Sequence, residues 1–182
     1  MSGHDSFAMP YEILASYEAR SLAHVAGAPE QVESAGLWRG IGFRVADRHF
    51  VSSIAEVNEI LTLPALTAVP GAKAWLLGIA NVRGNLVPVV DLRELVLGVR
   101  SQASDSTRVL VVRQIGGSVG LLVDEVLGQR SFSEDQLAAS VGEADENFGH
   151  FVGESVQLGD IQWGLFSMAA LVRSPQFQQA AA

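Results

Sequence analysis

The sequence has 182 residues, of which 48% are apolar and 18% charged, a balance typical of a globular chain and not of a disordered one. The formal net charge is −8, which disfavours nucleic acid and anionic lipid as partners because an acidic surface repels phosphate groups. There is no cysteine, which excludes thiol catalysis, disulfides and thiolate zinc sites.

The first ten residues lack the basic start and the apolar stretch of a signal peptide. No apolar run elsewhere approaches the roughly 20 residues that cross a bilayer. We therefore expect a cytoplasmic protein that is not exported and does not insert directly into a membrane.

The first expected element is a helix over residues 12–25, which follows Pro10 and shows apolar side chains at helical spacing. Gly27 and Pro29 end this helix, and a loop follows. We therefore expect residues 1–36 to form an extension, a helix and a loop, in front of the main domain.

Beyond residue 36 the apolar residues alternate with polar ones or occur in short runs, which is the pattern of strands. The Gly84-Asn85 pair favours a two-residue hairpin with a positive φ at the glycine. The expected strands are residues 41–45, 49–53, 76–82, 86–91, 108–114, 119–124, 149–156 and 161–166.

Short helical segments are expected between and after these strands. Residues 92–97 predict a helical turn that ends at Gly98. Ser133 and Gln136 form a capping box, which predicts the start of another. A last helix is expected over residues 168–173.

Many short strands joined by close turns predict an all-β fold. The strands cluster before and after residues 101–106, which suggests two small barrels. The expected organisation is therefore the extension over 1–36, a main domain of two barrels over 37–173, and a polar, flexible tail over 174–182.

No pattern in the sequence points to catalysis. The four histidines have no second ligand at metal-binding spacing. Asp124 and Glu125 are adjacent at a strand end and point to opposite faces, which excludes a facing acid–base pair and favours solvation or a hydrogen bond. Gly116, Gly117 and Gly120 precede a strand and not a helix, which argues against a phosphate loop. We expect no catalytic, cofactor-binding or metal-binding residue.

One long segment carries a specific motif. Residues 54–60 read Ile-Ala-Glu-Val-Asn-Glu-Ile, residues 69–71 read Val-Pro-Gly, and residues 77–92 read Leu-Gly-Ile-Ala-Asn-Val-Arg-Gly-Asn-Leu-Val-Pro-Val-Val-Asp-Leu. The order and spacing resemble the CheW family of chemotaxis coupling proteins. Residues 119–126 fit a later segment of the family, and the resemblance extends over about residues 41–172.

The chain is most similar to the PilI branch of this family, which serves type IV pilus (twitching) motility. The similarity rests on the expected N-terminal helix, on Trp-Arg-Gly-Ile-Gly-Phe at residues 38–43, and on Trp75 before the central motif. Ser167 departs from the family pattern, because many relatives carry an aspartate there, and this leaves the local geometry of the C-terminal helix open.

The resemblance implies two intertwined five-stranded SH3-like barrels and a non-catalytic adaptor without a cofactor. One surface would meet the regulatory domain of a CheA-like histidine kinase. A groove between the barrels would take the helical cytoplasmic tip of a methyl-accepting chemoreceptor. Such a protein is recruited to the inner face of the membrane through receptor arrays.

The resemblance also indicates residues that bind partners. Arg83 stands where the family uses an arginine for signalling contacts, and Glu59 is the matching acid with which it would pair. Core packing is the alternative role for the residues expected to line the groove, which are Val57, Ile60, Val82, Leu121 and Val123.

Other residues are expected to act in the structure. Gly78 and Gly84 would meet backbone requirements. Trp38 and Trp75 would be buried anchors that hold the N-terminal helix, with interface hot spots as the alternative. The remaining motif residues are Asn81, Pro88 and Asp91.

Two other functions stay open at this point. The chain could serve as the same kind of adaptor in flagellar chemotaxis, or it could be an enzyme whose site is built from dispersed residues. The partners captured from a native extract would distinguish them: a pilus receptor, a flagellar receptor, or neither.

Overall fold

The computed structural model describes residues 37–114, 116–138 and 148–180. The helix expected over residues 12–25, and the whole extension over 1–36, lie outside the described residues.

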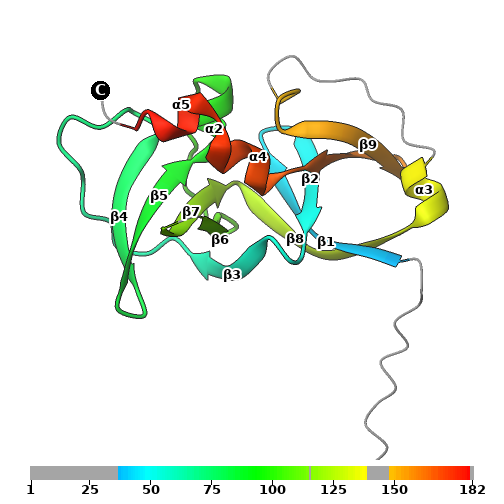
Figure 1. Ribbon diagram of the computed structural model, residues 1–182, viewed down its shortest axis with the longest axis horizontal. Helices are drawn as coiled ribbons and strands as arrows, with labels where there is room; N and C mark the ends of the chain where they lie inside the picture. Colours follow the sequence, from blue (N-terminus) through cyan, green and yellow to red (C-terminus); the bar gives the residue numbers. More distant parts are fainter. Residues whose placement is uncertain (1–36, 115, 139–147, 181–182) are drawn as a thin grey trace, which may run out of the picture. The chain divides into compact units, whose positions relative to one another are not determined.

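Two five-stranded sheets make up most of the described chain (Figure 1). Sheet A has the strand order β8-β1-β2-β10-β9 and sheet B has the order β3-β6-β7-β5-β4. The strands are β1 (Leu37–Val45), β2 (Arg48–Ser53), β3 (Val57–Thr62), β4 (Leu76–Val82), β5 (Asn85–Asp91), β6 (Arg108–Gln114), β7 (Gly117–Val123), β8 (Glu125–Ser133), β9 (Val152–Leu158) and β10 (Ile161–Phe166).

The all-β fold of two SH3-like barrels is confirmed, but the division of the strands between them at residues 101–106 is wrong. Sheet B takes β3, β4 and β5 from before that loop and β6 and β7 from after it. Sheet A combines the first two strands with the last three, through a parallel pairing of β2 with β10. The division failed because pairing over long sequence distances leaves no local signal in the sequence.

The expected strands agree with the observed ones to within a few residues, except that β3 and β8 were not predicted. Most of β8 is half-buried or exposed, and it runs through Gly128, Gln129 and Arg130. Gly128 has a φ of 81°, at a point where the register of β8 against β1 shifts. A polar strand with a bulge lacks the alternation by which strands are recognised.

A large apolar cluster joins the two sheets, and we call it the shared core. It includes Phe43, Phe50 and Phe166 from sheet A, and Leu110 and Leu121 from sheet B. The ring centroid of Phe43 lies 5.7 Å from that of Phe50 and 5.6 Å from that of Phe166. The opposite faces of the sheets fill two smaller clusters, one for each sheet. Each sheet is therefore apolar on both faces, and one face is covered only when both sheets are present.

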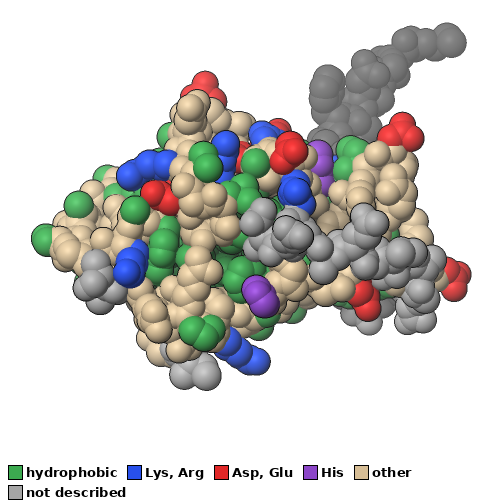
Figure 2. Space-filling model, turned by 90° about the horizontal axis from the view of Figure 1, so that it is seen from above, with side chains coloured by type: hydrophobic (Ala, Val, Ile, Leu, Met, Phe, Trp, Pro, Cys, Tyr) green, Lys and Arg blue, Asp and Glu red, His purple; other side chains and the backbone are tan. Residues whose placement is uncertain are grey.

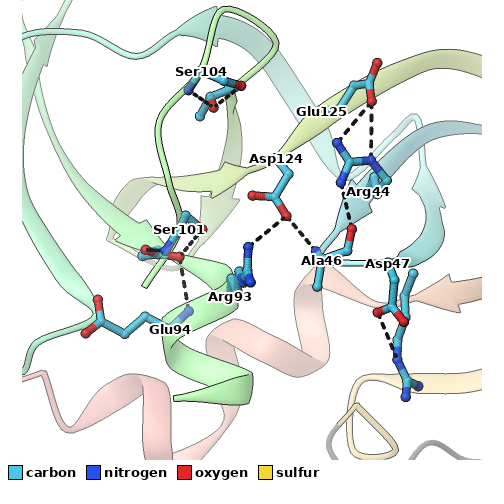
Figure 3. A network of polar contacts seen from close by, with 12 residues as sticks. Arg44, Ala46, Asp47, Arg93, Glu94, Ser101, Ser104, Asp124 and Glu125 are labelled. Carbon is cyan, nitrogen blue, oxygen red and sulfur yellow. Dashed lines mark hydrogen bonds and ion pairs between the residues drawn. The ribbon is translucent and has the colours of Figure 1, made fainter. Parts of the chain in front are cut away.

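Polar contacts also fasten the sheets at the junction of β7 and β8 (Figure 3). The buried Asp124 accepts a hydrogen bond of 2.6 Å from the backbone N–H of Ala46, and it lies 4.0 Å from the guanidinium of Arg93. Its own N–H donates to the carbonyl of Arg44 over 3.1 Å. The Arg44 side chain forms a 3.2 Å ion pair with Glu125. The hydrogen bond expected for Asp124 is thus present.

The predicted short helices are confirmed, and their caps explain their positions. Helix α2 (Leu92–Leu97) begins at Asp91, whose carboxylate accepts from the N–H of Glu94, and ends at Gly98 with a φ of 68°. Helix α3 (Glu134–Ala138) starts with the predicted capping box, in which Ser133 and Gln136 bond to each other's backbone N–H groups. These local motifs provide hydrogen-bond partners for the unpaired backbone groups at the helix ends, and they need no residue from elsewhere in the chain.

The C-terminal segment forms two helices, α4 (Met168–Arg173) and α5 (Pro175–Gln178). The hydroxyl of Ser167 accepts a hydrogen bond from the N–H of Ala170, so this serine caps α4. The polar tail expected after residue 173 is in fact helical from Pro175. Phe177 is 9% exposed and stacks on Trp75, with ring centroids 6.1 Å apart. Nε2 of Gln176 also donates a hydrogen bond of 2.6 Å to the carbonyl oxygen of Leu95, so the polar segment is attached by both apolar and polar contacts.

We predict that Phe177→Ala lowers the free energy of unfolding by about 3 kcal/mol, because it leaves a cavity against Trp75 and the shared core. Urea denaturation followed by tryptophan fluorescence measures this change. Gln179→Ala is the control, since the side chain is exposed and its loss should change stability by less than about 0.5 kcal/mol. Equal stability of both variants would mean that α5 does not contribute to the fold.

We also predict that Asp124→Ala lowers the free energy of unfolding by about 2 kcal/mol, since it leaves the N–H of Ala46 and the guanidinium of Arg93 without their acceptor. Asp124→Asn should cost less, because the amide oxygen can still accept from Ala46. Asp47→Ala, in the same turn but with a side chain 90% exposed, should be nearly neutral. Denaturant curves that coincide for Asp124→Ala and Asp47→Ala would contradict this role.

Candidate functional site

The hairpin between β4 and β5 turns at Arg83 and Gly84, with φ values of 52° and 85°. Val82 pairs with Asn85, so the two-residue loop lies one position earlier than the Gly84-Asn85 turn that the sequence predicted. Positive φ at both loop residues is the geometry of a type I′ turn. The carbonyl oxygen of the Asn81 side chain accepts from the N–H of Gly84 over 2.8 Å and supports the bend.

Arg83 and Glu59 form an ion pair, with Nη2 of Arg83 2.7 Å from Oε1 of Glu59. Glu59 lies on β3, whereas Arg83 follows β4, and these are the two outer strands of sheet B. The pair therefore connects the two edge strands of sheet B, which are not hydrogen-bonded to each other. The Arg83 side chain is 79% exposed and that of Glu59 is 19% exposed. Such an exposed pair contributes about 0–1 kcal/mol to stability, so its main effect is on the orientation of the arginine.

The expected groove residues fall into two groups. Val57 is half-buried against the shared core, and Ile60 is 40% exposed. Val82 is half-buried against the smaller apolar cluster on the opposite face of sheet B. Leu121 and Val123 are only 0% and 1% exposed. These last two are core residues and offer no contact surface. Their run of apolar residues is covered on both faces, which sequence alternation alone cannot distinguish from a half-exposed strand.

The motif glycine Gly78 allows a close approach of two backbones. It has a φ of 150°, and an added Cβ would lie 2.5 Å from the carbonyl oxygen of Thr67. Thr67 forms a β-bridge with Ile79, so the segment after β3 returns along β4. The motif therefore needs glycine here to keep this loop against the sheet.

The other motif residues lie in or beside the cores. Asp91 is fully buried, and its carboxylate accepts from the N–H and the hydroxyl of Ser101 at 2.8 and 2.7 Å, which holds the loop after α2. Trp38 packs near Phe132, with ring centroids 5.9 Å apart. Trp75 is 9% exposed, and Pro88 is half-buried.

A groove that the sequence did not reveal runs between the C-terminal helices and sheet B, and we call it the C-terminal groove. It consists of two adjoining hollows of about 370 and 350 Å³, which share Gln114, Val172 and Gln178. Figure 2, seen from the side of α5 in Figure 1, shows apolar side chains at the surface of this face, with both basic and acidic side chains among them. The remaining lining residues are Trp75, Leu76, Pro88, Val90, Arg113, Val119, Ala169, Arg173, Phe177 and Ala180. The groove was missed because its second wall is α4 and α5, which no local pattern places against sheet B.

Within residues 37–114, 116–138 and 148–180, no group of three or more His, Asp or Glu side chains could hold a metal ion. Among the same residues, no helix is both long and apolar enough to cross a membrane. His49 lies against Trp163, with ring centroids 5.3 Å apart, and His150 lies against Phe151.

Three comparisons relate the chain to known proteins. It is 36% identical to protein PilI of Pseudomonas aeruginosa over 172 residues, which are 94% of this chain and 96% of that protein. A probable chemotaxis protein CheW of Rhizobium etli is 38% identical over 87 residues, 47% of this chain and 56% of that protein. The crystal structure of the scaffolding protein TtCheW from Thermoanaerobacter tengcongensis superposes with a TM-score of 0.66, covering 97% of this chain and 96% of that one at 18% identity, and it shows the same fold.

The model of the CheW-like domain matches residues 39–176. This range includes all of β1 except its first two residues, the other nine strands, the Arg83 hairpin and helix α4, and thus nearly all of the described residues. The chain therefore belongs to the family of CheW-like domains.

Proposed function

We propose that the chain is a non-catalytic adaptor that couples a methyl-accepting chemoreceptor to a CheA-like histidine kinase and thereby controls type IV pilus motility. The observation that carries the proposal is the similarity to protein PilI over nearly the whole of both chains. The same adaptor in a flagellar pathway is the second candidate, favoured by the chemotaxis proteins among the relatives. The proposal puts the protein at the inner face of the membrane, where receptor tips gather.

The C-terminal groove supports the receptor half of the proposal. Leu76, Pro88 and Ala180 are half-buried and line one of its hollows, so the groove offers apolar contacts beside a helical wall. A helix can bury one face in such a groove through side chains spaced three and four residues apart. The receptor tip is helical in the family that this chain resembles, and it is the partner that we assign to this groove.

The Arg83 hairpin and strand β3 support the kinase half. Leu86, next to the hairpin turn, is 74% exposed, and Ile60 on β3 is 40% exposed. Exposed apolar side chains on the two elements that carry the Arg83–Glu59 ion pair offer the kinds of contact that interfaces use. None of the residues from Arg83 to Leu86 lines the C-terminal groove. We assign this patch to the kinase regulatory domain, which leaves the groove free for a receptor bound at the same time.

The proposal is tested by mixing the purified full chain with a receptor-tip fragment and with the kinase regulatory domain. Size-exclusion chromatography with light scattering should detect a ternary complex whose mass is that of all three. Capture from extract with pilus or flagellar receptors separates the two pathways. A chain that binds one partner only in the absence of the other would be a competitor and not an adaptor.

For the kinase surface we predict that Arg83→Ala weakens binding of the regulatory domain by about thirtyfold, on the order of 2 kcal/mol, through loss of a charge-assisted contact. The free energy of unfolding should fall by no more than about 1 kcal/mol, because the lost ion pair is exposed. Arg83→Lys should recover only part of the affinity, since an ammonium cannot form the bidentate fork. Isothermal titration and denaturant curves measure the two effects.

Arg100→Ala is the matched control, because Arg100 is also exposed but lies in the loop after α2. It should change neither binding nor stability. Normal kinase and receptor binding by Arg83→Ala would remove the arginine from the proposed interface. A large loss of stability would instead assign it to closing the barrel with Glu59.

A further inference from the structure

The C-terminal groove differs in charge from the chain as a whole. The chain has a net charge of −8, yet the lining of the groove contains Arg113 and Arg173 and no acidic residue. Both arginines are exposed. Neither makes an ion pair or a side-chain hydrogen bond with any residue in the described part of the chain. Two positive charges at this groove are thus available to a partner.

The backbone holds these two arginines on different walls of the groove. Arg113 lies on β6 and pairs with Ser118 of β7, in a regular ladder. Arg173 ends α4, directly after Val172, which is 9% exposed and packs in the shared core. Their attachment points are fixed by packed elements. A ligand that matches both charges therefore meets a preformed arrangement, which reduces the cost of binding.

From this arrangement we infer that the C-terminal groove selects an amphipathic helix whose apolar stripe is flanked by acidic side chains. The inference rests on the proposed function, because it names the chemistry by which the receptor helix is recognised. The hollow lined by the half-buried Leu76, Pro88 and Ala180 takes the apolar stripe. The neighbouring hollow, with Arg113 and Arg173, takes the carboxylates. A helix that carries both kinds of side chain can span both hollows, because they share lining residues.

The expected energetics follow from the exposure of the arginines. Charges at the rim of an interface act mainly through the association rate and the salt dependence of binding. Salt at about 1 M reduces the screening length to about 3 Å, compared with about 10 Å at 0.1 M. The preference for an acidic helix should therefore be large at low salt and small at high salt, while the apolar contribution persists.

The test uses the full chain and two synthetic peptides of about 20 residues, long enough for helix to form. Both carry the same stripe of Leu and Ala, flanked by Glu in one peptide and by Gln in the other. The wild type should bind the Glu peptide about tenfold more tightly at low salt. The R113E/R173E double variant should lose this preference or reverse it, with an unchanged melting temperature. Isothermal titration at two salt concentrations measures all of these affinities.

The matched control is the R39E/R100E double variant, which makes the same change of charge at two exposed arginines outside the groove. It should keep the preference for the Glu peptide. Equal affinity of the wild type for both peptides would overturn the inference. So would an equal loss of preference in R39E/R100E, because net charge and not the groove would then be the cause.

Two further outcomes separate the inference from the proposed function. A wild type that prefers the Glu peptide but binds no receptor-tip fragment would overturn the proposed function and leave the acidic preference of the groove intact. A dimer of the wild type that R113E/R173E dissociates, seen by light scattering, would overturn the inference, because the occupant would be a second copy of this chain.

Discussion

The shared core is the constraint on which the rest of the structure depends. Phe43 and Phe50 of sheet A and Leu110 and Leu121 of sheet B belong to one apolar cluster, so neither sheet can cover its own apolar surface alone. Burial of an aromatic or aliphatic side chain contributes about 1.5–3 kcal/mol, and this cluster contains many such residues. Both barrels therefore form one cooperative unit, although each has a smaller core of its own.

The two candidate surfaces owe their positions to this shared core. Leu171 and Val172 of α4 are buried in it, which fixes the helical wall of the C-terminal groove. The β4–β5 hairpin is formed by two paired strands, and Val90 of β5 is buried in the same cluster. The hairpin and the groove are thus both connected to the shared core. Under the proposed function, both partners would be bound to elements that pack on this one core.

Features set by neighbours in sequence were predicted well, and features set by distant pairing were not. The Gly98 cap of α2 and the Ser133 capping box depend on four or five consecutive residues, and both are present. The exchange of strands between the barrels depends on contacts across the whole chain, and the predicted division was wrong. Leu121 was expected in a groove because an apolar run does not reveal how many of its faces are covered. The groove arginines, Arg113 and Arg173, belong to no motif and become a pair only through the packing of α4 near β6.

The parallel pairing of β2 with β10 has a consequence for the synthesis of the protein. His49 pairs with Trp163, so β2 leaves the ribosome more than a hundred residues before its partner. The strands of sheet B, from β3 to β7, are contiguous in the chain and can pair while translation continues. During that time the apolar faces of β1 and β2 stay exposed to solvent, because β8, β9 and β10 have not yet been synthesised. Contacts of such high sequence separation form slowly, and the nascent chain is most exposed to aggregation and to chaperones just before its last strand is made.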